Sequence, residues 1–335
     1  MNKGSNEMYV FVGIDVSKEK LDIGWLREAG KVKTKVFSHR RSHFDALKGW
    51  LLKQTGVPAE QVVITLEPTG IYHEALLYDL HEAGFRLLQV NPGRARKYFE
   101  ALGQIHKTDK KDAVMLARYG RAQVTEGAPI FWQPEAPEAR HLKVLLRRLD
   151  ALEKDLQREE NRLEASSQSD CTDRVVQSIR DMIRVLKEEI ARLEQDIDDL
   201  IERHPYLRKN RRLLNSIKGI GDVMSRELVC LFACKYFKNA RQVSAFLGLI
   251  PKLRESGKMK GHTALSKTGP ARIRQKLYMA AVVASQHNQD IRAQRDRLLK
   301  QNKNKMQALG AAMRKLVQIC FGVIKHQTEY QPQVT

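Results

Sequence analysis

Apolar residues in the first 130 positions follow two periods, one typical of β-strands and one typical of α-helices. Asn91 to Gly93 interrupt the pattern, and helical segments then continue to about residue 123. The order predicts an α/β domain that begins with three antiparallel strands. The predicted elements are strands at 9–15, 21–26 and 32–37, a helix at 42–54, a strand at 61–66, a helix at 72–83 and a strand at 85–90.

A proline-rich segment at 127–137 separates this region from two long helical patterns joined by a polar turn at 166–170. The first helix repeats leucine from Leu145 to Leu163, and His204 with Pro205 ends the second. An antiparallel hairpin within one chain explains the patterns, and the functional interpretation adds a contact between two chains, because a two-helix hairpin alone buries little. The second helix carries a heptad seam of Val176, Ile179, Ile183, Leu186, Ile190, Leu193, Ile197 and Leu200.

The last third of the chain is helical and basic. Residues 213–222 resemble a helix-hairpin-helix element, in which Gly219 and Gly221 lead into a helix whose first amides can hold a DNA phosphate. A tight turn between two helices, without a ligand, is the other interpretation. The chain is therefore predicted to comprise an α/β domain (1–130), a linker with a coiled coil (131–205) and a mainly helical domain (206–335).

Four carboxylates fall where an open α/β sheet gathers its ligands. Asp15 and Glu67 each end a strand-like run, and Asp109 and Asp112 share one face at the start of a helical pattern. Oxygen-only ligands suit Mg²⁺ or Mn²⁺ rather than zinc, and two such ions about 4 Å apart hold both oxygens of a phosphoryl displacement. The strand order and these acids together predict a ribonuclease-H-like fold with metal-dependent nuclease chemistry.

The charge balance of the chain adds a partner to this picture. Lys and Arg number 59 against 39 Asp and Glu, and the formal net charge of +20 favours DNA or RNA as the partner. The sequence contains no run of about 18 apolar residues, so no membrane span is predicted, and the first residues lack the apolar stretch of a signal peptide. The scattered cysteines fit buried thiols in a reducing cytoplasm, although Cys230 and Cys234, one helical turn apart, could also form a metal pair.

A basic loop at 252–262, followed by a basic helix, forms a second candidate site. Ser256 lies in its middle, and a serine among cations can attack phosphorus, although a solvated loop residue is the simpler interpretation. Ser244 and Ser266 compete for this role, and Ser266 suits a helix N-cap. The predicted nucleic-acid contacts are Gly219, Gly221, Lys252, Arg254, Lys258, Lys260, Lys267, Arg272, Arg274 and Lys276.

Eight motifs, in order over nearly the whole chain, resemble those of the insertion-sequence-110 transposases, a family that includes bridge-RNA-guided recombinases and has pilin-gene invertases as relatives. Lys218 replaces a common proline and Pro270 follows Gly269, which are minor departures. The motifs are GIDVSKEKLD (13–22), LEPTG (66–70), NP (91–92), KTDKKDA (107–113), IKGIG (217–221), GLIP (248–251), ESG (255–257) and SKTG (266–269).

The resemblance implies a RuvC-like domain in which Asp15, Glu67, Asp109 and Asp112 bind Mg²⁺, with Mn²⁺ as a substitute. It also implies a coiled coil and a C-terminal transposase domain in which Ser256 attacks DNA and forms a covalent 5′-phosphoserine link. A structured noncoding RNA would pair with target and donor double-stranded DNA, and homodimers would assemble into a homotetramer. The implied location is the bacterial cytoplasm, at the nucleoid when the protein is bound to DNA.

RNA-guided DNA recombination is therefore the leading hypothesis for this chain. A metal-dependent RuvC-like nuclease of the junction-resolvase type, with a structural Ser256, is the alternative enzyme. A non-catalytic nucleic-acid-binding protein is the third reading, and it would leave four converging carboxylates to repel DNA unless a metal neutralised them.

Overall fold

The computed structural model describes residues 9–27, 31–68, 70, 72–104, 108–127, 129–166, 168, 172–252 and 264–333. The chain divides into two compact units, Met1–Pro134 and Glu135–Thr335. The two long helices, which the sequence predicted as part of a separate coiled-coil domain, belong to the second unit together with the C-terminal helices.

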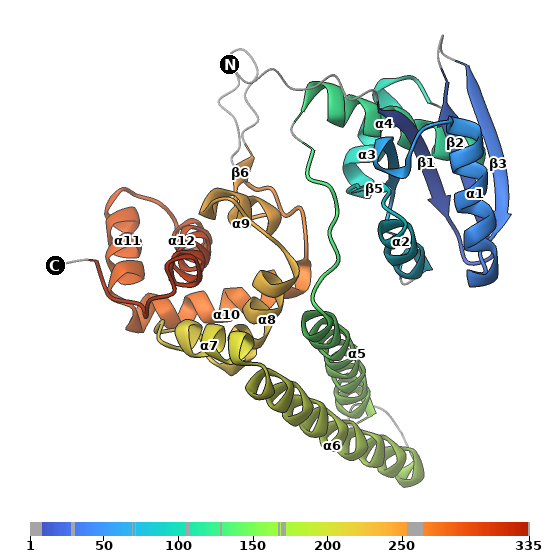
Figure 1. Ribbon diagram of the computed structural model, residues 1–335. Helices are drawn as coiled ribbons and strands as arrows, with labels where there is room; N and C mark the ends of the chain where they lie inside the picture. Colours follow the sequence, from blue (N-terminus) through green and yellow to red (C-terminus); the bar gives the residue numbers. More distant parts are fainter. Residues whose placement is uncertain are drawn as a thin grey trace. The chain divides into compact units, whose positions relative to one another are not determined.

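The first unit is built on a five-stranded mixed sheet (Figure 1). Its spatial order is β3-β2-β1-β4-β5, and the β1–β2 and β2–β3 pairs are antiparallel while the β1–β4 and β4–β5 pairs are parallel. The predicted strands and their order of directions are thus confirmed. The strands are β1 (Val10–Val16), β2 (Lys20–Leu26), β3 (Val32–Ser38), β4 (Val62–Leu66) and β5 (Arg86–Gln89).

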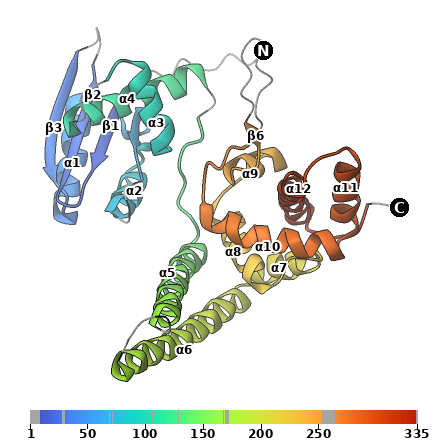
Figure 2. The same ribbon diagram turned by 180° about the vertical axis from the view of Figure 1, so that it is seen from behind.

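Helices cover both faces of this sheet, as Figures 1 and 2 show from opposite sides. One face packs against α1 (Phe44–Thr55) and α2 (Tyr72–Glu82), and the other against α3 (Pro92–Ala101) and α4 (Asp109–Glu126). A strand enclosed on both faces needs apolar side chains at nearly every position, and all five residues of β4 are buried. The continuous apolar run in the sequence therefore reflects the central place of β4.

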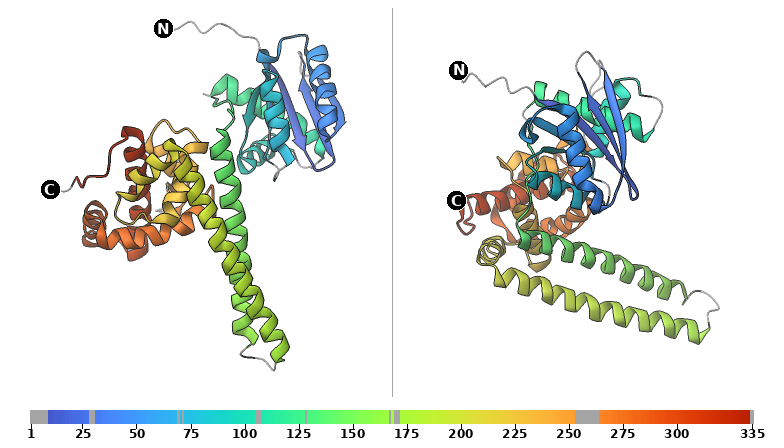
Figure 3. Two further views of the ribbon diagram at one scale, coloured as in Figure 1. Left: turned by 60° about the horizontal axis from the view of Figure 1, so that its bottom comes forward. Right: turned by 45° about the vertical axis from the view of Figure 1, so that its right-hand side comes forward.

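The second unit is almost entirely helical. Its two longest helices lie side by side as a hairpin (Figure 3), and Ile183, Leu193 and Ile197 of the predicted seam are buried there. The hairpin within one chain is thus confirmed. Its elements are α5 (Pro137–Ser166), α6 (Asp173–Arg203), α7 (Pro205–Asn215), α8 (Asp222–Cys234), α9 (Ala240–Phe246), β6 (Pro251–Lys252), β7 (Ala264–Leu265), α10 (Ala271–His287), α11 (Gln289–Lys300) and α12 (Lys305–His326).

A single apolar core joins the inner half of the hairpin to the C-terminal helices. Leu146 of α5 and Ile201 of α6 belong to it, together with Leu228 of α8 and Leu316 of α12. Among the described residues, no helix is both long enough and apolar enough to cross a membrane.

Candidate functional site

Parallel pairing of β1 and β4 brings two of the predicted acids to one edge of the sheet. Ile14 is paired with Leu66 at the end of the parallel ladder, so Asp15, the penultimate residue of β1, and Glu67, the first residue after β4, follow it side by side. Both side chains are partly exposed at this edge. The expectation that Asp15 and Glu67 lie at the carboxyl ends of neighbouring strands is therefore confirmed.

Two glycines allow α4 to lie directly on the sheet beside this edge. Gly13 and Gly24 face each other on β1 and β2. A Cβ atom on Gly13 would lie 1.9 Å from the carbonyl oxygen of Ala113, and one on Gly24 would lie 2.6 Å from the amide nitrogen of Val114. Only glycine fits at these two positions, because helix backbone occupies the space that a side chain would need.

The close contact places the first turn of α4 on the same side of the sheet as Asp15. Residues two apart on a strand share a face, so Asp15 lies on the Gly13 face, which α4 covers. Asp109 and Asp112 are both in the first turn of α4, and Asp112 precedes the residue that contacts Gly13. Gln104 Nε2 donates a 2.7 Å hydrogen bond to Asp112 Oδ1. All four predicted acids thus belong to one region of the first unit.

A fifth carboxylate, Asp22, lies in the same region. It is the cross-strand partner of Asp15, and it is 3% exposed. Lys20 Nζ lies 3.0 Å from Asp22 Oδ2 and 2.6 Å from Asp109 Oδ2, so one ammonium group links β2 to α4. A hydrogen bond with Asp109, and a weaker effect of the hydrogen bond with Asp22, raise the pKa of Lys20 above its ordinary value. Asp22 is not among the site residues that the sequence predicts, although an acid within an apolar strand is a signal that could have found it.

These donors suit a hard divalent cation, because they are carboxylate oxygens. The ammonium of Lys20 shows that a positive charge is well accommodated between Asp22 and Asp109. No group of three potential ligands in the described part of the chain is drawn together closely enough to hold an ion. By its chemistry this donor set suits a divalent cation, and metal binding by Asp15, Glu67, Asp109 and Asp112 stays a prediction.

The predicted nucleophile, Ser256, lies outside the described residues, as do Arg254, Lys258 and Lys260. The residues on either side form a short two-stranded ribbon in which Lys252 is paired with Ala264. The hydroxyl groups of the two competing serines each have a hydrogen-bond partner within the protein. Ser244 is fully buried and donates to the Ala240 carbonyl, and the Ser266 hydroxyl lies 3.2 Å from the Thr268 hydroxyl.

Close backbone contacts hold the base of this ribbon. A Cβ atom on Gly248 would lie 2.2 Å from the carbonyl oxygen of Thr268, and one on Gly269 would lie 1.9 Å from that of Phe246. Both glycines have positive φ angles, of 70° and 89°. The GLIP and SKTG motifs are therefore adjacent in space, with glycine required in each.

The three basic residues of α10 that were predicted to contact nucleic acid bind partners within the protein. Arg272 pairs with Glu227 of α8, and Lys276 Nζ lies 3.1 Å from Glu153 Oε2 and 3.2 Å from Glu227 Oε1. Arg274 donates to the Gly269 carbonyl at 3.0 Å. Lys267, by contrast, is exposed. Contacts of these residues with nucleic acid stay predictions.

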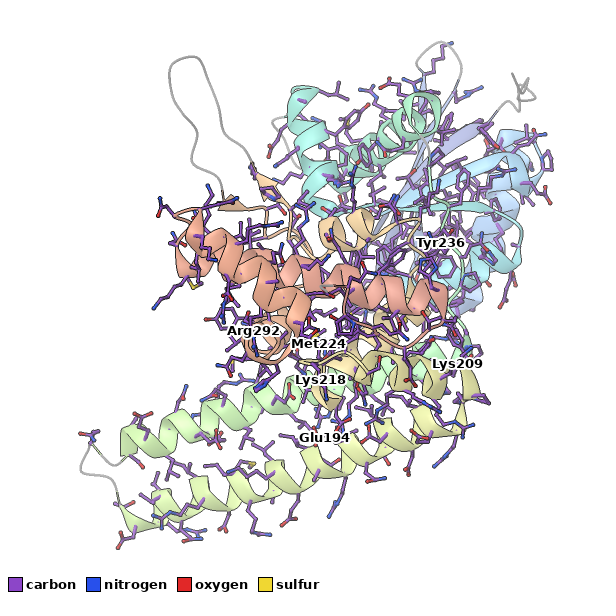
Figure 4. All side chains as sticks on the ribbon, turned by 90° about the vertical axis from the view of Figure 1, so that its left-hand side faces the viewer. Glu194, Lys209, Lys218, Met224, Tyr236 and Arg292 are labelled. Atoms are coloured by element: carbon purple, nitrogen blue, oxygen red, sulfur yellow. The ribbon has the colours of Figure 1, made fainter. Side chains whose placement is uncertain are left out.

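The predicted helix-hairpin-helix element consists of α7, a tight turn and α8. Gly219 has a φ of 103°, and a Cβ atom there would lie 2.6 Å from Ala284 Cβ, so this glycine lets the turn pack on α10. Gly221 precedes α8 and is exposed, with open space around the position of a Cβ atom. Lys218, labelled in Figure 4, is exposed in the same turn. Phosphate binding by Gly219 and Gly221 stays a prediction.

Three cysteines lie within the described residues. Cys230 and Cys320 are buried thiols, as predicted, and Cys234 is partly buried. The sulfur atoms of Cys230 and Cys234 lie 3.8 Å apart, and the Cys234 thiol donates to the Ala139 carbonyl. No third metal ligand joins this pair in the part of the chain that the structure covers.

Comparison with known proteins matches two family models to the chain. A model of DEDD transposases of the IS110 type, described as a transposase, matches residues 12–166. A second model, described as transposase IS116/IS110/IS902 family, matches residues 211–296. The first match contains all four predicted acids, and the second contains Ser256 and the basic helix.

Two similar proteins match nearly the whole length of the chain, and a third matches part of it. The pilin gene-inverting protein of Moraxella bovis is 28% identical over 327 residues, which is 97% of this chain and 98% of that protein. The pilin gene-inverting protein of Moraxella lacunata matches with the same identity and coverage. An uncharacterized 42 kDa protein of insertion element IS900 from Mycobacterium paratuberculosis is 23% identical over 155 residues, which is 45% of this chain and 39% of that protein.

Proposed function

Because the chain belongs to the IS110 family of transposases and is a DNA recombination enzyme, we propose that it exchanges DNA strands at a mixed active site. Acidic residues of a ribonuclease-H-like, or RuvC-like, domain would hold divalent cations, and Ser256 would supply the nucleophile. The observation that carries the proposal is the common placement of Asp15, Glu67, Asp109 and Asp112, which three separate elements bring to one region.

The sheet order supports the ribonuclease-H-like assignment. Three antiparallel strands followed by two parallel ones place β1 at the centre, with Asp15 at its end. In such a sheet the carboxyl ends of neighbouring parallel strands form the usual ligand site. The arrangement explains why acids far apart in the sequence can act on one phosphate.

In the proposed reaction, the Ser256 hydroxyl attacks a DNA phosphorus atom and loses its proton to solvent or a nearby base. A bond from Oγ to phosphorus forms, the bond from phosphorus to the 3′ oxygen breaks, and the leaving oxygen takes up a proton. A 3′-hydroxyl of the exchanged strand later attacks the phosphoserine and releases the serine. Bound Mg²⁺ would stabilise the charge that develops on the phosphate. The covalent link retains the bond energy, so rejoining needs no ATP.

The net charge of +20 supports extended contact with nucleic acid, and we propose that a structured noncoding bridge RNA selects target and donor DNA by base pairing. A protein that leaves sequence reading to RNA needs mainly backbone contacts from lysine and arginine. A cytoplasmic location, where such DNA and RNA are present, belongs to the same proposal.

We also propose that chains associate as homodimers that form a homotetramer. Support comes from three apolar side chains on α6 that point away from the hairpin core. Val175, Met182 and Val185 are 46%, 49% and 50% exposed, and they follow heptad spacing.

The deciding experiment incubates purified protein with its flanking noncoding RNA, labelled target and donor DNA, and Mg²⁺, and resolves the products under denaturing conditions. We expect a labelled protein–DNA adduct that disappears in Ser256→Ala and persists in Ser266→Ala, the matched control. Binding of RNA and DNA by Ser256→Ala stays near the wild-type level. Cleaved DNA without any adduct would instead indicate a metal-dependent nuclease, and strand exchange by Ser256→Ala would refute the serine mechanism.

A further inference from the structure

Asp22 is an ionisable side chain enclosed in the sheet of the first unit. Leu21 and Ile23 on either side of it are buried apolar residues, and Asp22 itself is 3% exposed. A buried carboxylate normally needs a charged or hydrogen-bonding partner to offset its lost hydration. Lys20, on the same face of β2, is such a partner, at 3.0 Å.

Lys20 also contacts one of the predicted catalytic acids, Asp109. Its ammonium lies 2.6 Å from Asp109 Oδ2, at the start of α4. Its other partner, Asp22, is directly opposite Asp15 in the β1–β2 ladder. The Lys20 ammonium therefore contacts a carboxylate, Asp109, that the proposed function assigns to a divalent cation.

The two partners of Lys20 differ in how firmly they are held. The Asp22 side chain is 4% exposed and belongs to β2, a strand paired on both sides, whereas the Asp109 side chain is 50% exposed and belongs to the first turn of a helix. A solvent-exposed ion pair contributes little and exchanges partners at low cost, whereas a buried one is costly to break. The link from Lys20 to Asp109 is therefore the one that can open.

Space for such a change is present beside the lysine. An open cleft of about 560 Å³ borders Lys20 and is lined by the β1–β2 turn, Ser17 to Glu19, and by Val36, Phe37 and Ser38 of β3. An ammonium group that leaves Asp109 can remain bonded to Asp22 while it turns toward this cleft.

We propose that Lys20 is the resident counter-cation of the carboxylate site, and that Asp22 is a positioning residue that anchors it. The inference rests on the proposed function, which supplies a divalent cation at Asp109. Without that cation, Lys20 holds the first turn of α4 against β2 and lowers repulsion among the acids. When the cation binds, Asp109 turns to it, and Asp22 keeps the lysine at the edge of the site.

The test measures Mn²⁺ binding to the full chain without nucleic acid, by the loss of the free-ion electron paramagnetic resonance signal. We expect Lys20→Met to bind Mn²⁺ about tenfold more tightly, because a neighbouring unit charge that repels the ion is removed. Asp22→Asn binds several-fold more weakly, because the released lysine then pairs with Asp109 alone. Lys20→Arg, which keeps the charge, stays close to the wild-type affinity.

Lys18→Met is the matched control, since Lys18 is an exposed lysine in the adjacent turn, and we expect its Mn²⁺ affinity to change by less than about twofold. A Lys20→Met variant with wild-type or weaker affinity would overturn the inference while leaving the proposed function intact. Failure of the wild-type protein to bind Mn²⁺, with no difference from Asp15→Asn, would instead count against the metal site of the proposed function.

Discussion

Both units contain clusters of acidic and basic side chains, but the two clusters are built differently. In the second unit, Glu227 of α8 is 1% exposed and pairs with Arg272 and Lys276 of α10. In the first unit, Lys20 pairs with Asp22 and Asp109 beside the partly exposed Asp15. The Glu227 cluster of the second unit is enclosed between helices, whereas the Lys20 cluster of the first unit opens at the end of a sheet.

A second buried ion cluster of the second unit also joins separate helices. Arg226 Nη1 lies 2.8 Å from Glu194 Oε1 and Nη2 lies 2.7 Å from Asp198 Oδ2, so this arginine joins α8 to α6. Glu194, labelled in Figure 4, lies on α6. Burial raises the pKa of Asp198, but its hydrogen bonds and charge attraction to Arg226 and Arg211 together outweigh burial, and the net pKa is lowered. These pairs fix how the hairpin meets the C-terminal helices.

Glu227 shows the cost of enclosing a charge. Burial raises its pKa although Arg272 and Lys276 lower it, and its Oε2 atom has no hydrogen-bond partner among the described residues. A buried pair of this kind orients helices more than it adds to stability. In the first unit, by contrast, Asp15, Glu67 and Asp112 are partly exposed and Asp109 is exposed, whereas Asp22 is buried. Enclosure, more than residue type, thus distinguishes the structural ion cluster around Glu227 from the site proposed in the first unit.

The largest effect is expected for Asp15→Asn. The change removes one proposed metal ligand, so strand cleavage with RNA, DNA and Mg²⁺ falls at least about a thousandfold, or about 4 kcal/mol. The free energy of unfolding does not fall, because repulsion among neighbouring acids is relieved. Cleavage kinetics and urea unfolding measure the two effects. Asp45→Asn, at an exposed position of α1, is the control, and wild-type cleavage by Asp15→Asn would refute the site.

The next effect is expected for Arg272→Met, and it acts on stability instead of chemistry. Glu227 loses a buried partner, so the free energy of unfolding falls by about 3 kcal/mol in urea. Activity per folded molecule stays near wild type. Arg241→Met, at an exposed position of α9, changes stability by less than about 0.5 kcal/mol. A variant of normal stability with weakened DNA binding would show that Arg272 contacts nucleic acid, as the sequence predicted.

A smaller effect is expected for Gly13→Ala, which should lower both the stability of the first unit and the rate of DNA cleavage. The added methyl group meets the Ala113 carbonyl, so α4 shifts, unfolding becomes easier by about 2 kcal/mol and cleavage slows. Gly49→Ala is the matched control, because Gly49 lies in α1 with nothing near a Cβ atom, and alanine there stabilises a helix by about 0.5–1 kcal/mol. Equal stability of the two variants would contradict the close contact between α4 and β1.

Much of the fold could be predicted from the sequence, because the patterns that specify it are local. The alternation at 9–15 and 21–26 and the continuous run at 61–66 indicated strands that the structure confirms within one or two residues. The helical spacing at 42–54 likewise corresponds to α1. Placement of Asp15 and Glu67 at strand ends followed directly, since both end an apolar run.

Contacts between distant residues could not be predicted in the same way. In the sequence, Asp22 is an acid within an apolar strand. Only the β1–β2 register places it opposite Asp15, and only the fold lets Lys20 link it to Asp109, which lies 89 residues beyond the lysine. Arg272 and Lys276 looked like a basic helix face, and only the packing of α10 on α8 and α5 showed their partners.

The sequence by itself therefore determined the elements, the acids at their ends and the basic character of the chain. Only the tertiary structure decided which charges are enclosed and which remain open to a ligand. The physical reason is that periodicity and turn chemistry act over a few neighbouring residues, whereas burial and ion pairing depend on sheet register and helix packing. Gly13 shows the connection, because its missing side chain is local and the helix it admits begins about 100 residues later.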